Sequence, residues 1–206
     1  MIQDWHTQIK VKTNSLDKQS FIRLQPEVVD IFINDAIDLF VKERYKDYEN
    51  TQKRSDELNP LVSEPVSLEV QEKDGYYKVI LPKNYFFHLT SDCKIKVGDK
   101  EGDVFLKKVQ LDDKTKVLND PFNKPNDNEV LLSFQNDSIF LYSIYPVTKF
   151  ILTYLKNPTK VNYKENISSE FDGKSAEKEI INLVVTKLLE NYESQRINTQ
   201  SKIPIE

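Results

Sequence analysis

The strongest hydrophobic pattern in the chain is a long helical segment near the C-terminus, residues 175–196. Plotted at 100° per residue, its apolar arc is about twice as wide as the roughly 100° stripe of a surface helix. Ser175 suits the N-cap position, and acidic residues follow in the first turn. We therefore expect the helix to contact more than one neighbour, either two parts of its own fold or one part and another subunit. The centre of the arc holds Ile181, Val184, Leu188 and Tyr192.

A second amphipathic helix is predicted to begin at Leu24-Gln25-Pro26-Glu27, because proline is favoured in a first helical turn. Apolar residues at i, i+3, i+4 and i+7 spacing predict one core face. That face comprises Val29, Phe32, Ile33, Ala36, Ile37 and Phe40. Ile31, Val41 and Tyr45 are assigned to the opposite, largely acidic face. They are either scattered surface residues or a contact with another chain.

Between these helices the pattern changes to a period of two, which predicts short strands from Val66 to Leu155. Residues 130–134 and 138–142 predict a hairpin around Gln135-Asn136-Asp137. The fold class is therefore α+β, an antiparallel β sandwich or open barrel flanked by N- and C-terminal helices that pack together. The expected divisions are an N-terminal arm and helix (1–60), a β domain (61–163), and a C-terminal helix and tail (164–206). Trp5, in the arm, is expected to be an anchor.

Composition favours a domain with much polar surface. Of 206 residues, 38% are hydrophobic and 30% are charged, and the net charge is −4. Such a chain is a poor general binder of nucleic acid, because phosphate contacts need clustered Lys and Arg. The 10 Tyr and 11 Phe argue against a disordered chain. The start of the sequence shows no secretory or membrane-spanning pattern, so a cytoplasmic, disulfide-free protein is expected.

Candidate chemistry is sparse. Cys93 is the single cysteine, and His88 is nearby in a strand-turn context. Ordinary structural roles are the favoured interpretation, and a Cys–His nucleophile is the alternative. Gly98 and Gly102 do not make a phosphate loop, since no apolar helix follows them. We therefore expect a protein that is not an enzyme, with no catalytic residues, no cofactor and no metal.

The segment 118–129, LNDPFNKPNDNE, is the one loop with several carboxylates: Asp120, Asp127 and Glu129. A calcium loop needs carboxylates at alternate positions and a glycine at its tight turn, and Pro121 and Pro125 stand in the middle instead. A rigid loop that presents Phe122 to a partner is the favoured interpretation.

Three features in order along the chain resemble virion structural proteins of crAss-like phages, which form rings in the neck and tail. The first is Trp5-His6 followed by the helix from Pro26 and by Thr51-Gln-Lys-Arg54. The second is Asn119-Asp-Pro-Phe-Asn-Lys-Pro125, similar to the family's short PF-x-KP loop. The third is Tyr154-Leu-Lys-Asn-Pro158 leading into the apolar terminal helix. More distantly, the chain is similar to tail adaptor proteins of other short-tailed phages.

The resemblance implies a homo-oligomeric ring, a dodecamer matching the portal symmetry, in the portal-to-tail assembly of a virion made in the host cytoplasm. Its partners would be the portal and other ring or tail proteins, and DNA would pass through the channel without sequence-specific binding. Such a ring closes through heterologous contacts. The residues expected at subunit contacts are Ile31, Val41, Tyr45, Phe122, Val185, Leu189 and Tyr192.

The alternative function is an intracellular β-sandwich module that binds a peptide or glycan through aromatic side chains. The platform would be formed by Tyr76, Tyr77, Tyr85, Phe86 and Phe87. Aromatic strands that fill a core are the simpler explanation of this run. An exposed cluster of these rings would favour the module.

Overall fold

The computed structural model describes residues 1–16, 24–48 and 51–200, without the side chains of Leu16 and of residues 193–200. The chain forms two compact units. One is a helical unit made of Met1–Leu61 and Pro158–Glu206, and the other is a barrel unit made of Val62–Asn157. The two ends of the chain thus build one unit, and the middle builds the other.

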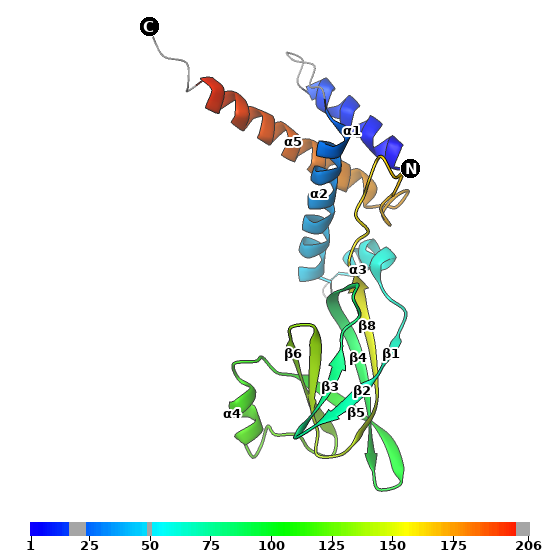
Figure 1. Cartoon of the computed structure of the whole chain (residues 1–206), viewed down its shortest axis with the longest axis vertical. Coiled ribbons are helices and arrows are strands. Elements are labelled where there is room, and N and C mark those ends of the chain that lie inside the picture. The colour runs from blue at the N-terminus through cyan, green and yellow to red at the C-terminus, as the bar shows by residue number, and fades with distance from the viewer. Residues whose placement is uncertain (17–23, 49–50, 201–206) are drawn as a thin grey trace. The chain divides into compact units, whose positions relative to one another are not determined.

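The helical unit contains α1 (Ile2–Leu16), α2 (Pro26–Lys46), α3 (Gln52–Leu58), the 3₁₀ turn η1 (Asn59–Leu61) and α5 (Glu177–Gln200). Both α1 and α2 pack against α5 (Figure 1). N- and C-terminal helices therefore pack together, as the sequence predicted. The wide apolar arc of α5 is covered largely by two helices of its own chain.

Helix α1 replaces the arm that was expected before Pro26. Its buried stripe is formed by Ile2, Trp5 and Ile9, which are at most 1% exposed, and by Thr13. Trp5 is thus an anchor, but it lies on a helix. The stripe is narrow, and Val11 is apolar but 62% exposed, so the sequence pattern of this helix is weak.

The ends of α5 also differ from the expectation. The carbonyl of Ala176 accepts hydrogen bonds from the backbone N–H groups of Glu179 and Ile180, at 3.1 and 3.0 Å. Ala176 therefore stands at the N-cap position that was assigned to Ser175. The helix continues beyond Arg196 to Gln200, whereas the tail Lys202–Ile205 lies outside the described residues.

The barrel unit is an eight-stranded sheet in the order β1-β8-β4-β5-β6-β7-β3-β2. All neighbouring strands are antiparallel except β5 and β6, which pair in parallel. The strands are β1 (Val66–Leu68), β2 (Val70–Lys73), β3 (Tyr76–Ile80), β4 (Tyr85–Val97), β5 (Lys100–Lys108), β6 (Glu129–Gln135), β7 (Ser138–Tyr142) and β8 (Val147–Lys156).

The sheet is nearly closed into a barrel rather than split into a sandwich. Its first and last strands, β1 and β2, are consecutive in sequence and are separated only by Glu69. One interior cluster joins residues from most of the strands. Its buried members are Val79, Leu81, Cys93, Ile95, Val130, Leu132, Ile139, Leu141, Val147, Phe150, Leu152 and Tyr154.

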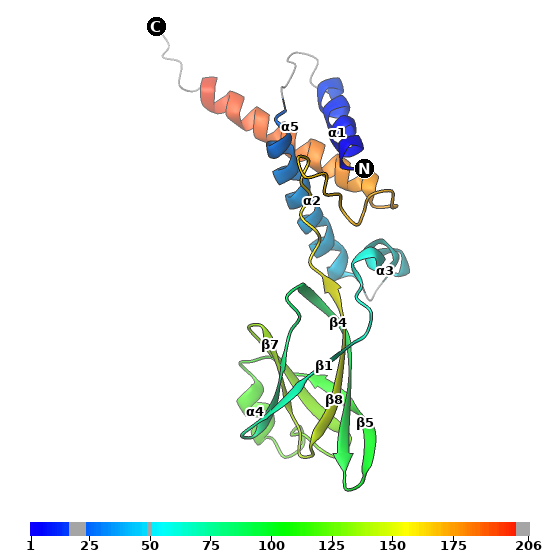
Figure 2. The ribbon, with the colours of Figure 1, turned by 45° about the vertical axis from the view of Figure 1, so that its right-hand side comes forward.

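A second, smaller cluster lies on the outside of the barrel. The connection between the parallel strands β5 and β6 contains α4 (Lys114–Asn119), which lies beside the barrel wall (Figure 2). Val117 and Leu118 of α4 pack on Leu131 and Tyr142. Leu131 thus faces α4, while its neighbours Val130 and Leu132 face the interior, as expected for alternating strand positions.

The predicted hairpin is confirmed by the pairing of β6 with β7. Its turn places Asn136 at φ 50°. Asparagine tolerates this left-handed conformation better than most residues other than glycine. The use of Asn136 agrees with the scarcity of glycine in the chain.

Candidate interaction surfaces

Among the described side chains of the two longest helices, α2 and α5, Ile31 is the most exposed apolar residue. It is 60% exposed on α2, and Val28, one turn earlier, is 36% exposed. Residues three apart lie on the same side of a helix. Val28 and Ile31 therefore present a small apolar surface in the helical unit, which we call the α2 surface.

Two residues expected at subunit contacts belong to the core instead. Val41 is fully buried, and Val185 is 4% exposed. Val41 lies ~40° around the helix from Ile37, at 100° per residue, so it extends the core face of α2 rather than facing away from it. The core of the helical unit also uses Phe171, whose ring meets that of Phe40 edge-on at 5.6 Å. This additional neighbour widens the buried arc of α2.

Three further candidates, Tyr45, Leu189 and Tyr192, are half-buried. Tyr45 already makes contacts within the chain. Leu189 and Tyr192 lie in the second half of α5, and neither is fully buried. They therefore combine packing within the chain with a part of their surface that a partner can reach.

Phe122 is 92% exposed in the connection between α4 and β6. The loop around it is held by Asp120, whose carboxylate accepts hydrogen bonds from the Phe122 N–H at 2.9 Å and from the Asn123 amide at 2.7 Å. The hydrogen bond from Asn123, followed by that from the Phe122 N–H, lowers the pKa of Asp120. Asp120 thus organises the loop that presents Phe122.

The sequence reasoning missed a second exposed ring on the barrel. Phe105 of β5 is 80% exposed. Two residues further on, the Lys107 ammonium donates to the Asn123 side-chain oxygen at 2.9 Å and ties β5 to the Phe122 loop. We call Phe105 and Phe122 the barrel aromatic surface. The sequence did contain a signal for this residue. Phe105 lies between Val104 and Leu106, which point inward, so the alternation of the strand places the Phe105 ring outward.

The carboxylates of segment 118–129 form no cation site in the structure. Across residues 1–16, 24–48 and 51–200, no three His, Cys, Asp or Glu side chains gather in a way that could hold a metal ion. The Asp120 carboxylate instead bonds to groups of its own loop.

The aromatic residues of the proposed binding platform do not share one exposed face. All five are half-buried. Tyr77 and Tyr85 pack against the interior cluster, whereas Tyr76 packs in the outer cluster beside Phe140. Phe86 and Phe87 contact each other, with ring centroids 4.3 Å apart. These rings are therefore divided between the two sides of the barrel wall.

Cys93 is a core residue of the barrel. It is 1% exposed, and burial raises the pKa of its thiol to about 12. A nucleophilic cysteine needs a lowered pKa. The His88 Nε2 atom lies 3.1 Å from the Ser91 hydroxyl. The geometry and the pKa of Cys93 both fit its structural interpretation.

The polar contacts of the helical unit hold its helices together. The Arg44 guanidinium of α2 bonds to Glu57 of α3 at 2.6 Å and to Glu179 of α5 at 2.5 Å. Burial lowers the pKa of Arg44, but the hydrogen bonds to Glu179 and Glu57 together raise it above its ordinary value. Glu57 is almost buried, with a side chain 9% exposed. One cation thus joins three helices.

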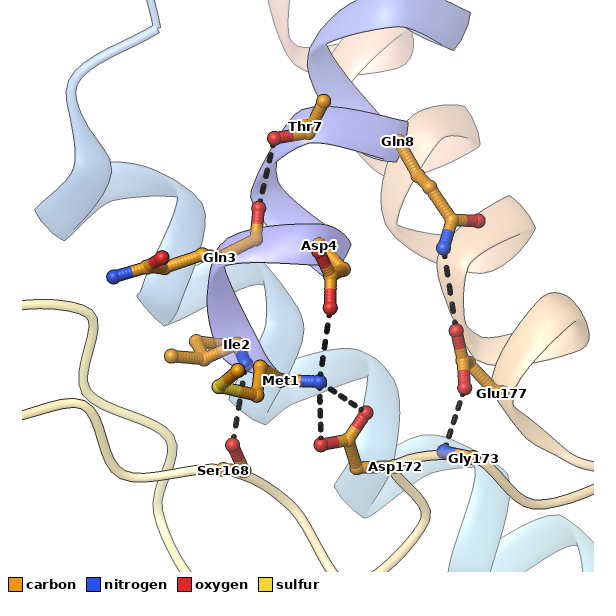
Figure 3. Close-up of polar contacts among 10 residues, drawn as sticks. All are labelled: Met1, Ile2, Gln3, Asp4, Thr7, Gln8, Ser168, Asp172, Gly173 and Glu177. Atoms are coloured by element: carbon orange, nitrogen blue, oxygen red, sulfur yellow. Dashed lines mark hydrogen bonds and ion pairs between the residues drawn. The ribbon is translucent and has the colours of Figure 1, made fainter.

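Helix α1 is fixed at its beginning (Figure 3). The Ile2 N–H donates to the Ser168 hydroxyl at 3.1 Å, and the Met1 amino group lies 2.8 Å from an Asp172 carboxylate oxygen. Further along, the Gln8 amide donates to Glu177 of α5, whose other oxygen accepts the Gly173 N–H at 2.7 Å. These contacts hold α1 against α5 and against the segment that precedes α5.

No model of a known protein family matches the chain, and no curated protein matches it in sequence. Within the described residues, no helix is long and apolar enough to cross a membrane. The fold and its surfaces define an α+β protein with a nearly closed barrel, a helical unit, and exposed apolar side chains on each.

Proposed function

We propose that the chain is a virion structural protein that forms a ring in the portal-to-tail assembly of a short-tailed phage, without enzymatic activity. The observation that carries this proposal is that each unit exposes large apolar side chains. Ile31 is 60% exposed in the helical unit, and Phe105 and Phe122 are 80% and 92% exposed in the barrel unit. Exposed large aromatic side chains are typical anchors of protein–protein contacts.

Two different surfaces on one chain are what a ring requires. In a heterologous contact, one surface of a subunit meets a different surface of the next, and the ring closes when the rotation permits. The α2 surface and the barrel aromatic surface are two such regions on separate units. The resemblance at Trp5-His6, the Phe122 loop and the terminal helix supplies the particular class, a ring protein of the phage neck and tail.

The charge of the chain supports a role around a DNA channel. Its net charge is −4, with 29 basic and 33 acidic residues. A channel-facing surface with this balance of charge would neutralise few phosphates and would bind DNA weakly. DNA would therefore pass without sequence-specific binding.

Native mass spectrometry of the purified protein, alone and with the portal protein, tests the proposal. We expect a closed homo-oligomer with the portal's symmetry, and electron microscopy should show rings. The double variant Phe105→Ser, Phe122→Ser should reduce the oligomer while leaving thermal unfolding of the monomer nearly unchanged, because both rings are exposed. A strict monomer that binds no portal protein contradicts the proposal.

A further inference from the structure

The helical unit contains a pocket that the proposed function does not use. It has a volume of about 360 Å³ and lies between α1, the beginning of α2 and Tyr163. Its α1 wall is formed by residues at i, i+3, i+4 and i+7 spacing, which share one face of a helix. The lining residues are Gln3, His6, Thr7, Lys10, Leu24, Pro26, Val29 and Tyr163.

Within this pocket, the imidazole of His6 is held in place by several contacts. Its Nε2 atom lies 2.8 Å from Oδ1 of Asp30, and the two side chains are only 11% and 13% exposed. The second oxygen of Asp30 accepts the Tyr163 N–H at 2.9 Å. The Tyr163 ring lies against the imidazole with centroids 4.6 Å apart. Asp30 and Tyr163 therefore fix the orientation of His6.

This arrangement leaves one nitrogen of His6 for a ligand. The carboxylate on Nε2 places a hydrogen on that atom, because a carboxylate only accepts. Among the described residues, the His6 ring is hydrogen-bonded through Nε2 and not through Nδ1, and His6 lines the pocket. Lys10, one turn further along α1, likewise forms no ion pair with any described residue.

From these contacts we infer that the pocket binds a carboxylate carried on a short apolar chain. Lys10 and the imidazolium form of His6 each carry a positive charge and can donate a hydrogen bond to the carboxylate. Leu24, Pro26 and Val29 form an apolar wall for the chain that carries it. The inference rests on this pocket alone and does not depend on ring assembly.

Carboxylate binding is coupled to the protonation of His6, since Nδ1 donates a hydrogen only in the imidazolium form. The titratable groups around it are Asp30 from α2, Lys10 from α1 and Tyr163, and the ion-paired Glu27 and Lys164 are the sequence neighbours of Pro26 and Tyr163.

Nuclear magnetic resonance of the full chain tests the inference, because His6 and His88 are the only two histidines and His88 serves as an internal control. Sodium butyrate is titrated at constant ionic strength, with butylammonium chloride as the probe of opposite charge. Butyrate should shift the His6 ring signals saturably and leave those of His88 unchanged. Lys10→Met, on an exposed position, should weaken binding about tenfold, as the loss of one charge-assisted contact does.

The source of the carboxylate is distinguished by a short valine-ended peptide with a free C-terminus and by the same peptide with an amidated C-terminus. Tighter binding of the free peptide than of butyrate indicates the C-terminus of a protein partner, and the reverse indicates a free small acid. Equal shifts of His6 and His88, an equal response to butylammonium, or full binding by Lys10→Met would each overturn the inference.

Discussion

Ser63 and Tyr154 exchange two hydrogen bonds. The Ser63 N–H donates to the Tyr154 carbonyl at 2.8 Å, and the Tyr154 N–H donates to the Ser63 hydroxyl oxygen at 3.0 Å. Ser63 is the second residue of the barrel unit, and Tyr154 stands near the end of β8, so the first and last parts of this unit are joined. Both residues are buried, at 8% and 4% exposure.

Removing the Ser63 hydroxyl should destabilise the barrel. Ser63→Ala leaves the buried Tyr154 N–H without its acceptor, which costs about 1–3 kcal/mol of unfolding free energy. Urea denaturation measures this difference. Ser67→Ala, at an exposed position of β1, is the matched control and should change the unfolding free energy by less than about 0.5 kcal/mol. Equal effects of the two variants would show that the hydroxyl contributes little.

Arg44 should matter more to stability than the other cations of the helical unit. Arg44→Met keeps the aliphatic stem but leaves the nearly buried Glu57 carboxylate without its 2.6 Å partner. Breaking such a pair from one side costs about 3 kcal/mol, reduced here by partial exposure. Thermal and urea unfolding followed by Trp5 fluorescence measure the loss.

Lys53→Met provides the control for Arg44. Its ammonium lies 3.9 Å from the other Glu57 oxygen, and its side chain is 82% exposed. Exposed ion pairs contribute little, so this change should cost under about 0.5 kcal/mol. A larger loss from Lys53→Met than from Arg44→Met would contradict the central role of Arg44.

The Cys93 thiol should react slowly with a disulfide reagent such as DTNB in the folded protein at about pH 8. Burial raises its pKa from 9.0 to about 12, so the reactive thiolate is scarce in the fold. The stabilising effect of this protonated thiol is complete below pH 9 and declines as the pH rises towards 12. Concentrated urea should accelerate the reaction at least about a hundredfold by opening the barrel. Rapid reaction without denaturant would contradict the burial of Cys93.

Leu189→Glu should reduce assembly more than folding. Leu189 is half-buried on α5, whereas Val185 is core. We expect Leu189→Glu to lower the oligomer mass in light scattering with only a modest fall in the thermal midpoint. Val185→Glu, the matched core change, should unfold the helical unit by burying an unpaired charge. If Leu189→Glu unfolds the monomer as severely, Leu189 belongs to the core.

The sequence predicted the elements whose hydrophobic period was regular. The hairpin at 130–142, the strand from Val147 and the helix from Pro26 all follow from local alternation or helical spacing, and each begins or ends at a turn residue or proline. Helix α1 was missed because its three buried large apolar residues, Ile2, Trp5 and Ile9, are accompanied by the exposed Val11, and together they give little periodic signal.

The long-range features of the fold could not be predicted from the sequence, for a different reason. The parallel pairing of β5 with β6 and the near closure of the barrel depend on which strands meet, and alternation within a strand does not encode that. Val41 was placed outward because the core face of α2 was assumed to be of ordinary width, while contacts with α5 and Phe171 widen it. The pocket beside His6 joins residues 3–10 with 24–29 and Tyr163, a tertiary juxtaposition without a sequence motif.

The junction at Glu69 limits how copies of this chain could join. Because the two outermost strands of the sheet, β1 and β2, are short and follow each other directly, the two ends of the sheet offer only short edges for strand addition between molecules. Strand addition at these two ends of the sheet would therefore join molecules through only a few backbone hydrogen bonds.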